Sequence, residues 1–86
     1  PDTEFLLIAP MMNNPKQPIG SEPIFAIRDK IVTLAGPGKA IVDMTTTHRE
    51  ILRRKDYLDL SGNGANHPND FLHRIYAQRV CEVLIP

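Results

Sequence analysis

The chain has 86 residues, 42% of them hydrophobic and 23% charged, and ten Lys and Arg residues balance ten Asp and Glu residues. A chain of this length buries only about 60% of the surface that it exposes when unfolded, so it lies near the lower limit for independent folding. Its neutral charge argues against a protein whose main task is to bind nucleic acid, and its one cysteine, Cys81, excludes an internal disulfide.

The first apolar run, residues 4–9, is short, continuous and ended by Pro10. A run of this length without alternation is typical of a strand buried on both faces of a parallel sheet. Even when extended to Met12 it is far shorter than the roughly 20 residues that cross a bilayer. The acidic Asp2 and Glu4 in front of it are unlike the basic start of a signal peptide. We therefore expect no membrane partner, and the compartment, cytoplasmic or secreted, stays open.

Residues 13–20 are rich in Asn, Pro and Gly and predict an exposed loop. A helix of about 14 residues is expected next, with Ser21 as its N-cap and the Gly-Pro-Gly of residues 36–38 as its stop signal. Residues 39–43 predict a second buried strand, so the order indicates a βαβ crossover with parallel strands. Four residues of the helix recur at helical spacing and are expected to face the core: Ile24, Ile27, Ile31 and Leu34.

Residues 47–50 (Thr-His-Arg-Glu) match a capping box and predict a helix that runs through Lys55. Residues 56–68 predict irregular structure. The last helix is expected to begin near Asn69 or Asp70. Its apolar residues are expected to face the core: Leu72, Ile75, Tyr76, Val80, Val83 and Leu84.

The expected order is therefore β-α-β-α-loop-α, with only two strands. Two parallel strands leave both edges of a sheet open, and buried strands need helices on both faces. The pattern therefore predicts a sheet with more strands than this chain contains. We therefore expect residues 1–86 to be the back half of one larger α/β domain, in keeping with a first residue, Pro1, that is not an initiator Met.

The most informative stretch is residues 63–74, where a Gly/Asn loop leads through His67-Pro68-Asn69-Asp70-Phe71 into an amphipathic helix. It resembles the last conserved block of the SGNH/GDSL family of serine ester hydrolases, in which a catalytic His precedes Pro on the loop before the C-terminal helix. The two expected strands are similar to the strands that precede this block. The resemblance covers most of the chain and implies the C-terminal part of a three-layer α/β/α, flavodoxin-like SGNH domain.

This resemblance implies that the complete protein is a GDSL-like esterase or acylhydrolase. Its substrate would be a small carboxylic ester, such as an acetyl or other acyl ester on carbohydrate, cleaved through an acyl-serine intermediate. His67 would be the catalytic base and then the acid, for which an imidazole is suited near neutral pH. Pro68 restricts His67 to an extended backbone and so fixes how the ring leaves the loop. Neither a metal nor an organic cofactor is implied.

The chain departs from the family pattern at the residue that orients the imidazole. The family has an Asp three residues before the His, and this position is Gly64 here. The candidates that remain to orient His67 are Asn66, Asn63 and Asp70. The absence of the Asp leaves a serine–histidine dyad as one outcome.

The second departure is the nucleophile. The family's Gly-Asp-Ser block and the two blocks that carry its oxyanion donors are absent from these residues. The only serines are Ser21, which reads as a helix cap, and Ser61, which lies in a Gly loop. We therefore expect this chain to supply the base of an active site but to be inactive alone.

The expected partners are a small ester substrate and either the missing N-terminal half or a second copy of the chain, with no nucleic acid. The alternative from another class is a non-enzymatic βαβ interaction module, or an inactive fragment, that keeps a His-Pro loop without its chemistry. A Gly-Asp-Ser segment upstream of Pro1 would favour the hydrolase.

Overall fold

The structure is a computed structural model that describes residues 3–17, 20 and 22–85. Its elements are β1 (Phe5–Ala9), α1 (Glu22–Val32), β2 (Lys39–Asp43), α2 (Met44–Ile51), the 3₁₀ helix η1 (Tyr57–Asp59) and α3 (Asp70–Leu84). The two strands pair in parallel, with Phe5 opposite Lys39 and Ala9 opposite Asp43. The predicted α/β class and the βαβα…α order are confirmed, and both strands lie where the sequence predicts them.

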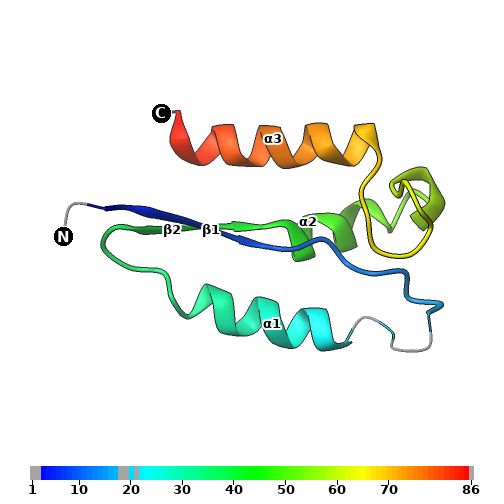
Figure 1. Cartoon of the computed structure of the whole chain (residues 1–86), viewed down its shortest axis with the longest axis horizontal. Helices are drawn as coiled ribbons and strands as arrows, with labels where there is room; N and C mark the ends of the chain where they lie inside the picture. Colours follow the sequence, from blue (N-terminus) through cyan, green and yellow to red (C-terminus); the bar gives the residue numbers. More distant parts are fainter. Residues whose placement is uncertain (1–2, 18–19, 21, 86) are drawn as a thin grey trace.

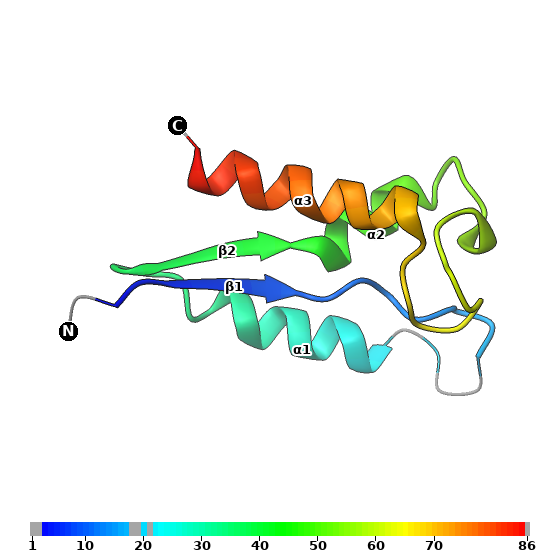
Figure 2. The ribbon, with the colours of Figure 1, turned by 45° about the horizontal axis from the view of Figure 1, so that its top comes forward.

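The helices α1 and α3 lie on opposite sides of the two-stranded sheet, as Figures 1 and 2 both show. α1 contacts both strands, and α3 contacts β2. Both strands run toward α2 and the yellow loop of residues 61–68 (Figure 1). The fold therefore sets this loop, which carries His67, beyond the carboxyl ends of the parallel strands.

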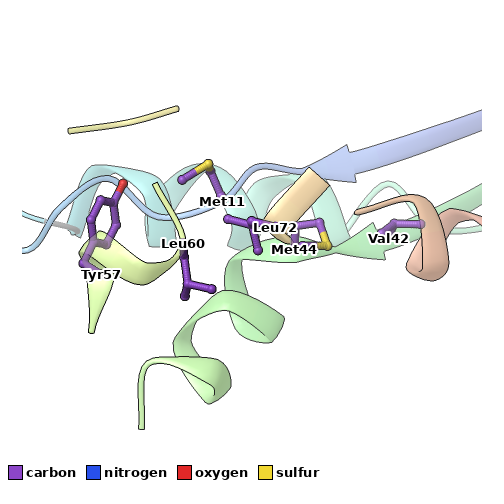
Figure 3. Packing of buried hydrophobic residues seen from close by; sticks show 6 residues of the cluster. All are labelled: Met11, Val42, Met44, Tyr57, Leu60 and Leu72. Atoms are coloured by element: carbon purple, nitrogen blue, oxygen red, sulfur yellow. The ribbon is translucent and has the colours of Figure 1, made fainter. Parts of the chain in front are cut away.

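The buried core gathers where α2, η1 and α3 meet the carboxyl ends of the strands. Partly buried side chains from β1, from the end of α2 and from α3, including Leu6, Ile51 and Ile75, pack against it. Figure 3 labels its six buried members: Met11, Val42, Met44, Tyr57, Leu60 and Leu72. The buried core therefore lies at the end of the sheet from which the loop of residues 61–68 extends.

The N-cap of α2 is Asp43, so the predicted capping box at Thr47 was wrong. The Asp43 carboxylate accepts the N–H of Thr46 at 2.9 Å and its hydroxyl at 2.7 Å. Thr47 lies inside the helix, where its hydroxyl donates to the Asp43 carbonyl at 3.0 Å. The strand therefore turns directly into α2, which ends at Ile51 rather than at Lys55.

The prediction that Ile27 and Leu34 face the core was wrong, because both are exposed. α1 ends at Val32, before Leu34 is reached. Ile24 and Ile31 are half-buried as predicted. Phe25 and Arg28 between them are also half-buried, and Nε of Arg28 donates to the Asp43 carboxylate at 2.8 Å. The predicted N-cap, Ser21, lies outside the described residues.

The prediction that the strands are buried on both faces was also wrong for β1. Phe5 and Ile8 are 55% and 40% exposed, because the described sheet has only one neighbour for this strand. The prediction that Val83 and Leu84 face the core was wrong as well, because both are exposed at the end of α3. They line a pocket of about 480 Å³ together with residues at the amino ends of the strands.

The beginning of α3 is as predicted. Asn69 is its N-cap and accepts the N–H of Leu72 at 3.0 Å. Leu72 is fully buried, and the later residues Ile75, Tyr76 and Val80 pack against the core. Residues 56–68 are irregular as predicted, except for the short helix η1.

Candidate functional site

The loop of residues 61–68, here called the His67 loop, is closed at its base by hydrogen bonds. The Gly62 N–H donates to the His67 carbonyl at 2.9 Å, and the Asn69 N–H donates to the Leu60 carbonyl at 2.9 Å. The Ser61 hydroxyl also donates to the His67 carbonyl, at 2.9 Å. The two ends of the loop, next to η1 and next to α3, are therefore held together by hydrogen bonds.

Asn63 organises the inside of this loop. Its Oδ1 accepts three successive backbone N–H groups, from Ala65 at 2.9 Å, Asn66 at 3.0 Å and His67 at 3.1 Å. Such a cluster of donors around one oxygen satisfies backbone groups that have no partner in a helix or sheet. The amide oxygen of Asn63 is thereby assigned, and its Nδ2 faces the other way.

Gly64, three residues before His67, has a backbone conformation that favours glycine. Its φ is +73°, in the left-handed region that side chains with a Cβ rarely adopt. A Cβ built on Gly64 would also lie 3.3 Å from Cδ2 of Leu58. The backbone of the loop therefore favours glycine over a carboxylate-bearing residue at this position.

Asn66 is the residue that the structure brings to the imidazole. Because Nδ2 of Asn63 is a donor, the Asn66 atom at 3.1 Å from it is the amide oxygen, Oδ1. The same Oδ1 lies 2.6 Å from Nδ1 of His67. Nδ2 of Asn63, a donor, lies 2.9 Å from the same nitrogen. With its hydrogen on Nδ1 the ring donates to Oδ1 of Asn66, the nearer of the two atoms, and Nε2 carries the lone pair; in the other tautomer Nδ1 accepts from Nδ2 of Asn63.

The remaining candidates do not reach the imidazole. Asp70 lies in the first turn of α3 and is exposed, and within the described residues no hydrogen bond joins it to His67. A carboxylate in the first turn is favoured by the helix dipole, which accounts for its place. Ser61 is bound to the backbone of the loop, since its hydroxyl donates to the His67 carbonyl and accepts the Gly64 N–H at 2.8 Å. The structure therefore groups Asn63 and Asn66 with His67 and leaves Asp70 apart.

Two residues that sequence reasoning missed contact the His67 loop. Asn14, predicted to be a turn residue, donates its backbone N–H to the Ala65 carbonyl at 2.7 Å and its Nδ2 to the Gly64 carbonyl at 2.9 Å. The hydroxyl of the buried Tyr57 lies 2.9 Å from the same Ala65 carbonyl. A buried tyrosine hydroxyl needs a partner, which is the one signal the sequence offers. Nothing in the sequence points to Asn14.

His48 is fully buried in α2 and does not belong to the site. Its Nδ1 accepts the Met12 N–H at 2.9 Å, so the ring is neutral and carries its hydrogen on Nε2. Desolvation by burial lowers the pKa of His48 to about 4. Its ring packs on that of Tyr57 with centroids 5.3 Å apart. His48 is a structural residue that joins α2 to the chain after β1.

Among the described residues no three His, Cys, Asp or Glu side chains lie together as metal ligands would. In the same residues, no helix has the length and apolar character needed to cross a membrane. No protein-family model matches the chain, and no curated protein or solved structure is significantly similar to it.

Proposed function

We propose that this chain is the C-terminal part of an SGNH/GDSL-type serine hydrolase that cleaves a small carboxylic ester, with His67 as its catalytic base. One observation carries the proposal. The Asn66 amide oxygen lies 2.6 Å from Nδ1 of an exposed imidazole, in the place of an acceptor for a hydrogen on Nδ1, and with the hydrogen there Nε2 is free to accept a proton. This is the tautomer that a base of a serine hydrolase needs.

The position of His67 also supports the proposal. The His67 loop lies beyond the carboxyl ends of two parallel strands (Figure 2), the edge at which open α/β sheets bind ligands. Helices cover both faces of the sheet, while Phe5 and Ile8 of β1 stay exposed. Further strands of a larger α/β/α domain would cover these side chains and satisfy the open edges.

The proposed reaction uses a serine from the N-terminal part of the domain. Nε2 of His67 takes the proton of the serine hydroxyl while the oxygen attacks the ester carbonyl, and it then donates that proton to the departing alkoxide. Water cleaves the acyl-serine in the same way, giving its proton to Nε2. The resulting carboxylic acid leaves, and the serine regains its proton from Nε2.

The test is hydrolysis of p-nitrophenyl acetate by the protein made from its complete reading frame. His67→Ala is expected to lower kcat by about 10²- to 10⁴-fold, the usual contribution of a general base. His73→Ala is the matched control, because His73 is an exposed histidine of α3, and it should leave kcat unchanged. Residues 1–86 alone should show no turnover. Wild-type rates in His67→Ala, or no Gly-Asp-Ser segment before Pro1, would contradict the proposal.

The exposed apolar side chains favour one second candidate, a non-enzymatic interaction module. Phe5, Val83 and Leu84 border the same pocket at the amino ends of the strands. In this reading the chain buries these side chains against another protein or a second copy. A complete protein without esterase turnover that forms stable dimers in light scattering would favour the module.

A further inference from the structure

The segment that follows β1, residues 11–14, runs between the core and the His67 loop and is hydrogen bonded on both sides. We infer that Tyr57 and Asn14 are positioning residues, which hold the His67 loop on this segment and thereby set the direction of the His67 imidazole. The inference rests on the proposed role of His67 as the base, and it adds the residues that aim it.

The inner side of the segment is fixed to two helices. The Met11 N–H donates to the Tyr76 hydroxyl of α3 at 2.6 Å, and the Met12 N–H donates to Nδ1 of His48 in α2 at 2.9 Å. Both methionines are buried. Since these bonds join backbone to packed side chains, the segment moves with the core rather than with the surface.

On its outer side the segment contacts the loop through two donors of Asn14, and the Tyr57 hydroxyl of η1 lies between segment and loop. Asn14 donates its N–H to the Ala65 carbonyl at 2.7 Å and its Nδ2 to the Gly64 carbonyl at 2.9 Å. The Tyr57 hydroxyl lies 2.8 Å from the Met12 carbonyl and 2.9 Å from the Ala65 carbonyl, so it sits between segment and loop. Tyr57 is buried, so its removal leaves polar groups unpaired.

The hydrogen bonds to Ala65 also restrict the side chains of the loop that contact the His67 imidazole. The Ala65 N–H donates to Oδ1 of Asn63, which aligns the amide of that residue. Nδ2 of Asn63 lies 3.1 Å from Oδ1 of Asn66 and 2.9 Å from Nδ1 of His67, and Nδ1 lies 2.6 Å from Oδ1 of Asn66. Because the His67 ring is exposed and has little packing of its own, its direction depends on this chain of polar contacts.

Tyr76 provides a matched comparison with Tyr57. Both hydroxyls bond the backbone of residues 11–14, and both tyrosines pack in or against the core. The hydroxyl of Tyr57 also contacts the His67 loop, whereas the hydroxyl of Tyr76 bonds only Met11 within the described residues. Loss of the Tyr76 hydroxyl should therefore affect stability without turning the imidazole.

The experiment compares Tyr57→Phe, Asn14→Ala and Tyr76→Phe in the complete protein by two NMR measurements. Amide hydrogen exchange of Ala65, Asn66 and His67 reports the bonds to Asn63, and imidazole nitrogen shifts report the tautomer of His67. Tyr57→Phe and Asn14→Ala are expected to speed exchange about tenfold, the effect of one lost buried hydrogen bond, and to change the ratio of the two tautomers from that of the wild type. Tyr76→Phe is expected to change neither.

The esterase readout should follow the same division. Tyr57→Phe and Asn14→Ala are expected to lower kcat about tenfold and change KM less than about twofold, the pattern of lost alignment rather than lost binding. Unchanged exchange and tautomer in both variants would overturn the positioning role. These NMR measurements need no turnover, so they test it even if His67→Ala contradicts the proposed esterase. If His67→Ala loses its esterase activity while Tyr57→Phe and Asn14→Ala keep the wild-type kcat, the positioning role is overturned and the proposed esterase is not.

Discussion

Oδ1 of Asn66 and Nδ1 of His67 lie 2.6 Å apart, although they belong to consecutive residues. Consecutive side chains of a strand point to opposite faces, so regular structure would separate them. They meet because Oδ1 of Asn63 gathers three successive N–H groups and bends the backbone around itself. An amide oxygen thus holds the imidazole, which orients the ring but adds no negative charge beside it.

Asn66→Asp is expected to raise the esterase rate of the complete protein. A carboxylate accepts Nδ1–H in a charge-assisted bond that is about twice as strong as a neutral one. It also stabilises the imidazolium that forms when Nε2 takes the serine proton. We expect kcat for p-nitrophenyl acetate to rise about tenfold.

Asn66→Ala is the opposing variant, because it removes the acceptor and keeps the loop backbone. Its kcat should fall below that of the wild type, and its imidazole should populate both tautomers. If Asn66→Ala and Asn66→Asp both turn over at the wild-type rate, Asn66 does not orient the base.

Stability is expected to fall in acid because of His48. Burial lowers the pKa of His48 to about 4 in the folded protein, whereas an unfolded histidine has a pKa near 6.5. Between these pH values His48 is protonated in the unfolded chain but neutral in the folded chain. The free energy of unfolding therefore decreases as the pH falls from about 6.5 to about 4. At about 1.4 kcal/mol per pKa unit the loss is at most about 3 kcal/mol. Urea unfolding at a series of pH values measures it.

The matched control for this pH dependence is His73, which is exposed on α3. His48→Gln should flatten the unfolding free energy between pH 6.5 and 4, and it should lower stability at pH 7 because the Met12 N–H loses its partner at Nδ1. His73→Gln should leave the slope as in the wild type. An equal slope in all three proteins would mean that His48 is not the group responsible.

The local signals in the sequence were sufficient for much of the fold. Both strands and the start of α3 were predicted, because apolar runs and an Asn before a helix act over a few residues. The grouping of Asn66 with His67 was among the predicted alternatives for the same reason. Such features need no knowledge of distant parts of the chain.

The residues that the sequence did not disclose depend on contacts between distant segments. The bond from Asn14 to the Gly64 carbonyl joins positions 50 residues apart, and no local pattern encodes it. Thr47 matched a capping box, yet Asp43 is the cap because it already stands at the end of β2. The exposure of Phe5 likewise follows from the number of strands beside it rather than from its own apolar run.

Asp43 is expected to be the main determinant of where α2 begins. Partial burial by itself raises the pKa of this carboxyl, but the hydrogen bonds from Thr46, and then Arg28, outweigh it and hold the pKa below its usual value. Asp43→Ala should cost about 1–2 kcal/mol, as the loss of a helix cap does. The contribution is present above the unfolded pKa of about 3.9 and is lost as the pH falls through the lower folded value.

Arg28→Gln separates the ion pair from the cap at Asp43. It removes the 2.8 Å contact between Nε and the carboxylate but leaves both bonds from Thr46. We expect a smaller loss of stability than in Asp43→Ala, and one that diminishes in high salt, because this arginine is partly exposed. Thermal unfolding of the two variants and of the double variant measures the coupling. Equal losses in both single variants would mean that the ion pair, not the cap, dominates.

Leu72 and Leu58 provide the test of where the core lies. Leu72 is fully buried in the cluster under the His67 loop, whereas Leu58 of η1 is 65% exposed. Leu72→Ala should cost about 2–5 kcal/mol, because the lost contacts leave a cavity that packed neighbours cannot fill. Leu58→Ala should cost under about 1 kcal/mol, since little of its surface leaves water on folding. Denaturant unfolding measures both, and a cost for Leu58→Ala as large as that for Leu72→Ala would place the core elsewhere.

If the core does carry the loop, Leu72→Ala should also speed amide exchange at Ala65, because the loop is bonded to a segment that packs on this cluster.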